Sequence, residues 1–184
     1  MRTILIGITG ASGSIYGIRL LEFFKKSDIN LILIVSESAK KIIEYETNYT
    51  YDRIKLLAEK AYENDDLLAG PASGSYPVDA MIIIPCSMKT LSAICQGYGD
   101  TLISRAASCM LKENKLLILT PRETPVDLPF LKNMLNAKKA GAVVLPAMPG
   151  FYHQPNTIDE LVDFIVGKIL DQLKVTHSLY KKWK

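Results

Sequence analysis

Three glycines spaced three residues apart form the first stretch of this chain that could bind a ligand. They are Gly7, Gly10 and Gly13, within ILIGITGASGSIYG (residues 4–17). Glycine lets the backbone turn sharply and lets a ligand approach without a Cβ in the way. Free N–H groups at the helix start that follows favour an anion, and Thr9 and Ser12 add hydroxyl donors. We interpret the stretch as a phosphate-binding turn for a nucleotide-like ligand; the alternative is an ordinary strand–helix turn without a ligand.

The spacing of these glycines excludes two common phosphate-binding motifs. The dinucleotide fingerprint is G-x-G-x-x-G, with an acidic residue about 20 positions later for the ribose. Here the spacing is G-x-x-G-x-x-G, and the second expected strand ends in Ser36. No G-K-[ST] follows, so the stretch is not a Walker loop either.

A second turn combines a proline with two hydroxyls and a lysine at the start of a helix. In Pro85-Cys-Ser-Met-Lys-Thr90, the side chains of Ser87, Lys89 and Thr90 could hold a phosphate or the polar edge of a ring. The alternative is that Ser87 caps the helix and Lys89 is solvated. Cys86 is better explained as a small buried side chain than as a nucleophile.

Two more turns carry groups of interest. Pro121-Arg-Glu-Thr-Pro125 holds Arg122 and Glu123 between prolines that restrict the loop. Arg122 suits a bidentate grip on phosphate and Glu123 could move a proton, whereas a surface ion pair is the alternative. In the turn at 146–155, Tyr152 offers a hydroxyl donor and His153 is expected to be a loop hydrogen-bonder.

The elements that must position these turns follow from hydrophobic periodicity. Apolar runs predict strands at 4–7, 31–36, 79–85, 116–120 and 142–145. Helices are expected at about 13–26, 38–47, partly within 52–62, and at 87–97, 100–113 and 127–140, with a last helix that starts at the capping box Thr157–Glu160. Strands that alternate with helices predict a parallel sheet, in which all segments after a strand emerge at one edge. Five turns should meet there: 7–17, 36–38, 85–90, 121–125 and 146–155.

Composition narrows the class of protein. The chain has 184 residues, 48% hydrophobic and 22% charged, so we expect one globular domain. A net charge of +3 is too small to argue for nucleic acid. Three cysteines without a C-x-x-C pair indicate a reducing compartment, and two histidines are too few for a histidine metal site. Neither a signal peptide nor an apolar run of about 18 residues is present, so the expected location is the cytoplasm.

Several sequence blocks resemble a known family. TGASGSIYGIRLL, PASGS, PCSMKTLSAI, PRETP and PGFYHQP occur in this order and are similar to motifs of the flavin prenyltransferases of the UbiX type, formerly described as small decarboxylase subunits. The resemblance covers about residues 1–183. It implies an α/β, flavodoxin-like Rossmann fold, with a doubly wound, mostly parallel sheet in a three-layer sandwich. We expect a single flavin-binding domain over 1–184, whose tail, 175–184, packs on the site or on a neighbouring subunit.

The resemblance also implies a reaction. Members of the family are metal-independent enzymes that join a dimethylallyl group from dimethylallyl phosphate to N5 and C6 of reduced FMN. The product, prenylated FMN, passes to a decarboxylase of the UbiD type, and ubiquinone biosynthesis and aromatic-acid decarboxylation both draw on it. A homododecamer with sites between subunits is expected, without nucleic-acid or membrane partners. The lack of an aspartate-rich magnesium motif favours a monophosphate donor over a diphosphate.

Residue by residue, the resemblance implies three groups of site residues. Cofactor-binding residues would be Thr9, Gly10, Ala11, Ser12, Ser36, Ser87, Met88, Lys89, Thr90 and Arg122. Residues around the prenyl phosphate would be Glu46, Lys112, Arg122, Tyr152 and Lys168. Catalytic residues would be Ser12 near N5, Glu46 as proton donor, Glu123 as proton acceptor for ring closure, and Trp183 over the site. The family often has arginine at the position of Lys168, and local sequence alone gives no special role to Glu46, Lys112 or Lys168.

Two other functions remain as alternatives. A flavin-dependent cysteine decarboxylase shares the fold and a PAS-type loop but relies on an early histidine, whereas this chain has only His153 and His177. An FMN-binding assembly subunit of an aromatic-acid decarboxylase complex would need few of Glu46, Lys112, Glu123 and Tyr152.

Overall fold

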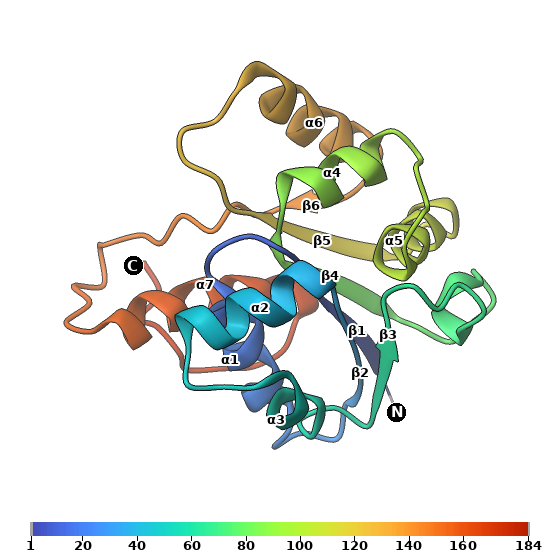
Figure 1. The fold of residues 1–184 in the computed structure, drawn as a ribbon. Helices are drawn as coiled ribbons and strands as arrows, with labels where there is room; N and C mark the ends of the chain where they lie inside the picture. Colours follow the sequence, from blue (N-terminus) through green and yellow to red (C-terminus); the bar gives the residue numbers. More distant parts are fainter. Residues whose placement is uncertain (1, 184) are drawn as a thin grey trace.

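The computed structural model of the chain describes residues 2–183 as a parallel sheet with helices on both faces (Figure 1). Its strands are β1 (Thr3–Ile8), β2 (Asn30–Val35), β3 (Lys60–Glu63), β4 (Ala80–Cys86), β5 (Leu116–Pro121) and β6 (Val143–Val144). Its α-helices are α1 (Ser14–Phe24), α2 (Glu37–Glu46), α3 (Tyr51–Lys55), α4 (Met88–Cys95), α5 (Leu102–Lys112), α6 (Leu128–Lys139) and α7 (Ile158–Leu173). None of these helices is long and apolar enough to cross a membrane.

The order of the strands identifies where a ligand is expected. The sheet runs β3-β2-β1-β4-β5-β6, and every neighbouring pair is parallel. The chain moves outward from β1 to β3, then returns to the other side of β1 and continues from β4 to β6. The order therefore reverses between β1 and β4, and ligands of such sheets bind at this switch point. The predicted doubly wound α/β fold is confirmed.

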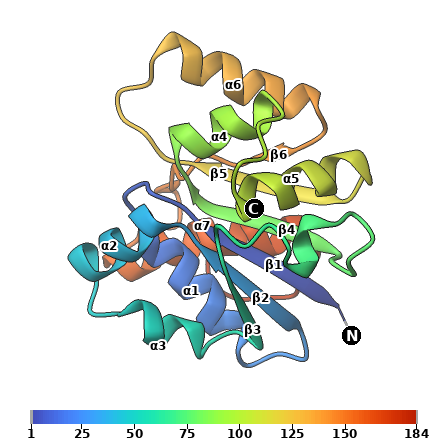
Figure 2. The same ribbon diagram turned by 45° about the vertical axis from the view of Figure 1, so that its right-hand side comes forward.

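Both faces of the sheet are covered because its strands are apolar on both sides. Ile4, Ile6 and Ile8 of β1 face a core built with α1 and α7, whereas Leu5 faces a second core built with α5. Figure 2 shows the resulting layers: α1, α2, α3 and α7 on one side of the sheet, and α4, α5 and α6 on the other. The continuous apolar runs predicted this, since a strand buried on both faces does not alternate.

One predicted segment is confirmed only in part. The segment 52–62, predicted to be partly helical, contains most of α3, but α3 ends at Lys55 and the chain then forms β3, an edge strand paired with β2 that was not predicted. The sequence of β3 is KAYE, whose first and last residues are exposed. A short, charged edge strand has no apolar run to reveal it, because only pairing with β2 holds it in place.

Candidate functional site

The turns after β1 and β4 are tied together by one buried threonine at the switch point. The Thr9 hydroxyl donates to the carbonyl of Pro85 at 2.8 Å and accepts from the N–H of Ser87, also at 2.8 Å. Thr9 is 1% exposed. It was predicted to bind the cofactor, but the structure places it behind the cavity wall, where it fixes the relative position of two turns that line the cavity.

The glycine turn after β1 needs glycine at two positions. Gly13 has φ +98°, a left-handed conformation that disfavours a side chain, and it is the N-cap of α1. At Gly10, a Cβ would lie 2.2 Å from the Oγ of Ser38 in α2. The turn can therefore approach α2 closely only because residue 10 has no side chain.

Glu46, the last residue of α2, caps the N-terminus of α1. Its Oε2 accepts from the N–H groups of Gly13 and Ser14, at 2.9 and 3.2 Å, and from the Ser14 hydroxyl at 3.1 Å. Gly13 has no side chain to cap the helix, so Glu46 takes that role. Partial burial raises the pKa of Glu46, but hydrogen bonds from Ser12, Gly13 and Ser14 outweigh it and bring the pKa below its ordinary value. Glu46 is therefore a carboxylate at neutral pH in the ligand-free chain.

The turn after β5 meets the glycine turn through an arginine. Arg122 Nε donates to the backbone carbonyl of Ser12 at 3.0 Å, across 110 residues of sequence. Tyr16 lies beside it; burial raises the pKa of Tyr16, while the charge of Arg122 lowers it in part. Glu123 follows Arg122 and also lines the cavity. A cation and a carboxylate thus stand next to the glycine turn.

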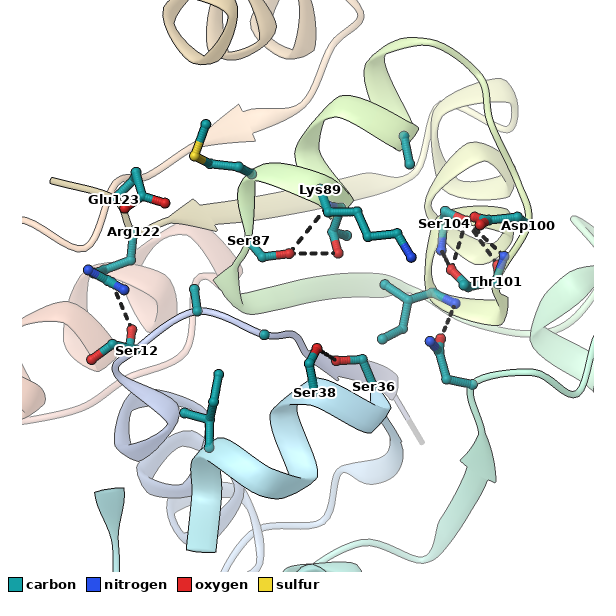
Figure 3. Close-up of a pocket in the computed structure, with 18 residues that line it drawn as sticks. Ser12, Ser36, Ser38, Ser87, Lys89, Asp100, Thr101, Ser104, Arg122 and Glu123 are labelled. Atoms are coloured by element: carbon teal, nitrogen blue, oxygen red, sulfur yellow. Dashed lines mark hydrogen bonds between the residues drawn. The ribbon is translucent and has the colours of Figure 1, made fainter. Parts of the chain in front are cut away.

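A cavity of about 400 Å³ lies among these turns (Figure 3), within the size range of small-molecule sites. Three helices begin at its wall, each capped by a hydroxyl: Ser36 for α2, Ser87 for α4 and Thr101 for α5. Each helix start carries a partial positive charge and free N–H groups, and Lys89 adds a full charge. The cavity is suited to an anion with a polar, hydroxyl-bearing body.

The structure brings most of the predicted cofactor residues to this cavity. The predicted residues that line it are Gly10, Ala11, Ser12, Ser36, Ser87, Met88, Lys89, Thr90, Arg122 and Glu123. Four of the five turns expected at this edge are therefore represented in its wall. Their roles toward a bound ligand stay predictions.

Several lining residues were missed by the sequence reasoning. They are Ser38, Ile42, Asn64, Ala93, Asp100, Thr101, Ile103 and Ser104. Thr101 and Ser104 form a capping box, a signal that the pattern T-L-I-S offered. Asn64 directly follows β3 and accepts from the N–H of Ile103 at 3.1 Å, so it was missed together with that strand.

Besides Thr9 and Glu46, four predicted residues do not line this cavity: Tyr152, Trp183, Lys168 and Lys112. The rings of Tyr152 and Trp183 meet edge to face, with 5.2 Å between their centres, and both residues line a separate hollow of about 330 Å³. Lys168 lies in α7, with its Nζ 4.9 Å from the ring centre of Tyr180. Lys112 ends α5 beside Gly74 of the PASGS loop and pairs loosely with Glu113 at 3.9 Å. It stands eight residues beyond Ser104, about 12 Å along the helix axis.

Comparison with known proteins identifies relatives over the whole chain. A family model described as Flavoprotein matches residues 1–170. A flavin prenyltransferase UbiX from Methanocaldococcus jannaschii is 48% identical over 181 residues, covering 98% of this chain and 97% of that protein. The flavin prenyltransferase UbiX from Salmonella typhimurium is 40% identical and covers 100% of this chain and 99% of its own length.

Solved structures agree with these sequence relatives. AnUbiX in complex with FMN and dimethylallyl pyrophosphate has a TM-score of 0.97 and 40% identity, covering 100% of this chain and 97% of that chain. A dodecameric FMN-dependent UbiX-like decarboxylase from Escherichia coli O157:H7 also has a TM-score of 0.97, with 39% identity over 99% of both chains. Peptidyl-cysteine decarboxylase EpiD, at 20% identity, a TM-score of 0.63 and 82% and 83% coverage, shares the fold alone.

Proposed function

The chain belongs to the flavin prenyltransferases of the UbiX type, and we propose that it joins the dimethylallyl group of dimethylallyl phosphate to N5 and C6 of reduced FMN. The observation that carries the proposal is the near-identical fold of AnUbiX, whose structure contains FMN and dimethylallyl pyrophosphate. The cavity at the β1/β4 switch point supports it, because its wall is formed by turns and helix starts that suit such ligands.

The cavity residues fit FMN. Hydroxyl and N–H donors at the starts of α2, α4 and α5 would hold its phosphate and ribityl hydroxyls, with Lys89 supplying charge. Gly10 and Ala11 offer a wall without bulky side chains for the flat ring system. Reduced FMN, when bound, supplies the two nucleophilic positions of the reaction, N5 and C6.

The residues of the chain would then act on the prenyl phosphate. Arg122, Tyr152 and Lys168 would bind the phosphate and stabilise its charge as the allylic C–O bond breaks. Lysine is a compact point charge, so Lys168 would bind without the bidentate geometry of arginine. Tyr152 and Trp183, which pack edge to face, would exclude water from the allylic group.

Two carboxylates, Glu46 and Glu123, would donate and accept protons during the reaction. The ligand-free pKa of Glu46 is low, but a phosphate dianion bound nearby would raise it, since like charges disfavour a second ionisation. A proton taken up by Glu46 could then pass to the departing phosphate. Glu123 would accept the proton that leaves C6 during ring closure. Its position beside Arg122, on the wall of the same cavity, supports this role.

The assembly and the cellular context are further parts of this proposal. We infer a homododecamer, as stated for the E. coli structure, and a UbiD-type decarboxylase as recipient of the product, in ubiquinone biosynthesis or aromatic-acid decarboxylation. Lys112, at the far end of α5 from the cavity, would reach a site only in a neighbouring subunit.

All three cysteines are free, which supports a cytoplasmic location. We also propose that 1–184 acts as one flavin-binding domain.

Mass spectrometry of the flavin tests the reaction directly. Purified protein, reduced FMN and dimethylallyl phosphate, kept anaerobic, should give a flavin heavier by one C5H8 unit. Dimethylallyl diphosphate in a parallel reaction distinguishes the two donors. A flavin that binds but keeps its mass with both donors would refute the transferase and favour the assembly subunit.

A variant separates the two bond-forming steps. Glu123→Gln removes the proton acceptor but keeps the size of the side chain, so product should stall after attachment at one position and before ring closure. The stalled and closed products differ in absorbance spectrum. If Glu123→Gln forms the ring-closed product at the normal rate, Glu123 is not the proton acceptor. If the variant no longer binds FMN, the substitution acts on the structure of the cavity instead.

A further inference from the structure

The segment that follows α7 folds back and converges on one carboxylate of that helix. Asp171 Oδ2 accepts from the Tyr180 hydroxyl at 2.5 Å, and Oδ1 accepts from Lys182 Nζ at 2.8 Å. His177 Nε2 lies 3.2 Å from Oδ1. The N–H of Leu179 donates to His177 Nδ1 at 3.3 Å, which leaves Nε2 as the protonated nitrogen that donates to Asp171. One side chain therefore holds three residues of the C-terminal segment.

The carboxyl group of Asp171 is ionised throughout the neutral pH range. Its partial burial raises the pKa, but hydrogen bonds from Lys182, Tyr180 and His177 outweigh this effect and lower the pKa to about 2. Hydrogen bonds to a charged acceptor are about twice as strong as neutral ones. The convergence of three donors on a permanent carboxylate is thus a stable attachment point for the segment.

The surface of α7 is shaped to receive this segment. At Gly167, a Cβ would lie 2.5 Å from Cδ1 of Tyr180 and 2.8 Å from Cε1 of His177. Tyr180 is 8% exposed and its ring centre lies 5.0 Å from that of Phe164. The Tyr180 ring fits into a space that exists only because residue 167 is glycine. The space above Gly167 and the hydrogen bonds to Asp171 therefore favour the same position of the C-terminal segment.

Two groups assigned above to the prenyl phosphate depend on this attachment. Lys168 Nζ lies over the Tyr180 ring, 4.9 Å from its centre, and Tyr180 raises the pKa of Lys168. Trp183 follows Lys182 directly, and its ring meets Tyr152 edge to face. Trp183 is 74% exposed, so its own contacts hold it only weakly. The attachment at Asp171 is what brings Trp183 back to Tyr152.

We propose that Asp171 is a positioning residue, which anchors the C-terminal segment 175–183 on α7 and thereby places Trp183 and Lys168 for the substrate phosphate. Gly167 acts with it, by leaving room for the Tyr180 ring. The effect on substrate rests on the proposed function of Tyr152, Lys168 and Trp183, whereas the attachment itself does not.

Fluorescence tests the attachment without any substrate, because Trp183 is the only tryptophan of the chain. The steady-state fluorescence anisotropy of Trp183, which reports how freely the side chain moves, should fall in Asp171→Asn and in Gly167→Ala. The ratio of attached to detached segment should fall about tenfold, the cost of one hydrogen bond to a charged group. Gln172→Ala is the matched control, since Gln172 is the exposed neighbour of Asp171 on the same helix. Trp183 anisotropy equal to wild type in both variants would overturn the proposal.

Kinetics test the consequence for substrate. In Asp171→Asn and in Tyr180→Phe, which keeps the ring but removes the donor, KM for dimethylallyl phosphate should rise about five- to tenfold, with FMN affinity unchanged. A lowered Trp183 anisotropy with an unchanged KM would overturn the positioning role. If wild-type protein transfers no prenyl group while its Trp183 anisotropy is higher than in Asp171→Asn, the proposed function fails and the attachment stands.

Discussion

Replacement of Glu46 by glutamine tests how the glycine turn is held, and its magnitude follows from the contacts. Glu46→Gln keeps an oxygen acceptor for Gly13 and Ser14 but removes the negative charge at the N-terminus of α1. A charge at that position contributes about 0.3–1 kcal/mol when exposed, and the stronger hydrogen bonds to a carboxylate add to it. Removing an acidic charge from the C-terminus of α2 offsets part of the loss. We expect a net destabilisation of about 1 kcal/mol, or about 2–4 °C in Tm for a chain of this size.

The dependence on pH separates this mechanism from a general packing defect. The pKa of Glu46 is lower in the folded chain than its ordinary value of 4.5, because the hydrogen bonds favour the carboxylate. Its contribution to stability is therefore complete above pH 4.5 and disappears as the pH falls through the lowered pKa. The difference between wild type and Glu46→Gln should be present at pH 7 and should decrease in acid.

Urea unfolding at a fixed protein concentration, at several pH values, measures this difference. Glu44→Gln is the control. Glu44 is exposed on the same helix, and its substitution removes the same negative charge from the C-terminal end of α2. It should be neutral or slightly stabilising. Equal effects of the two substitutions at pH 7, or a loss in Glu46→Gln that persists unchanged in acid, would refute the capping role.

Three further substitutions test other parts of the site. Gly10→Ala places a methyl group against the Ser38 hydroxyl, so FMN affinity in a fluorescence titration should fall about tenfold or more, as for an overpacked contact of 1–3 kcal/mol. Thr9→Val leaves the N–H of Ser87 without a partner, whereas the Pro85 carbonyl still accepts from the backbone N–H of residue 9 at 3.2 Å, and the free energy of unfolding in urea should fall by about 1–3 kcal/mol; a loss below the error would contradict the bridging role. Arg122→Lys keeps the charge but loses the donor to Ser12, and kcat/KM for the prenyl donor should fall about tenfold; activity equal to wild type would contradict it.

The sheet and most of the cavity wall could be predicted because both depend on local signals. Runs such as LILIV are continuous and apolar since both faces of β2 are covered. Once the strands are known, parallel topology alone brings the turns after β1, β2, β4 and β5 to one edge. The strand β3 was missed because it depends on pairing with β2, and Asn64 was missed with it.

Long-range contacts explain what local reasoning could not supply. Glu46 has no distinctive neighbours in sequence, yet it meets Gly13 from 33 residues away. Only the resemblance to the family singled it out. The course of the C-terminal segment likewise depends on Asp171, which no motif marks. Local sequence predicts which residues end a strand, but it does not predict which distant side chain comes to meet them.

The position of Lys112 has a genetic consequence. Lys112 lies at the opposite end of α5 from the cavity of its own chain, so in the proposed homo-oligomer another copy would supply it to a shared site. Two inactive proteins, one carrying Lys112→Ala and one carrying Arg122→Ala, would then restore activity when expressed together, since some sites in the mixed particle receive both intact side chains. In such an assembly, the effect of a mutation would depend on whether it removes Lys112 or Arg122 from the shared site. A defective subunit would then lower the activity of the intact subunit beside it as well as its own.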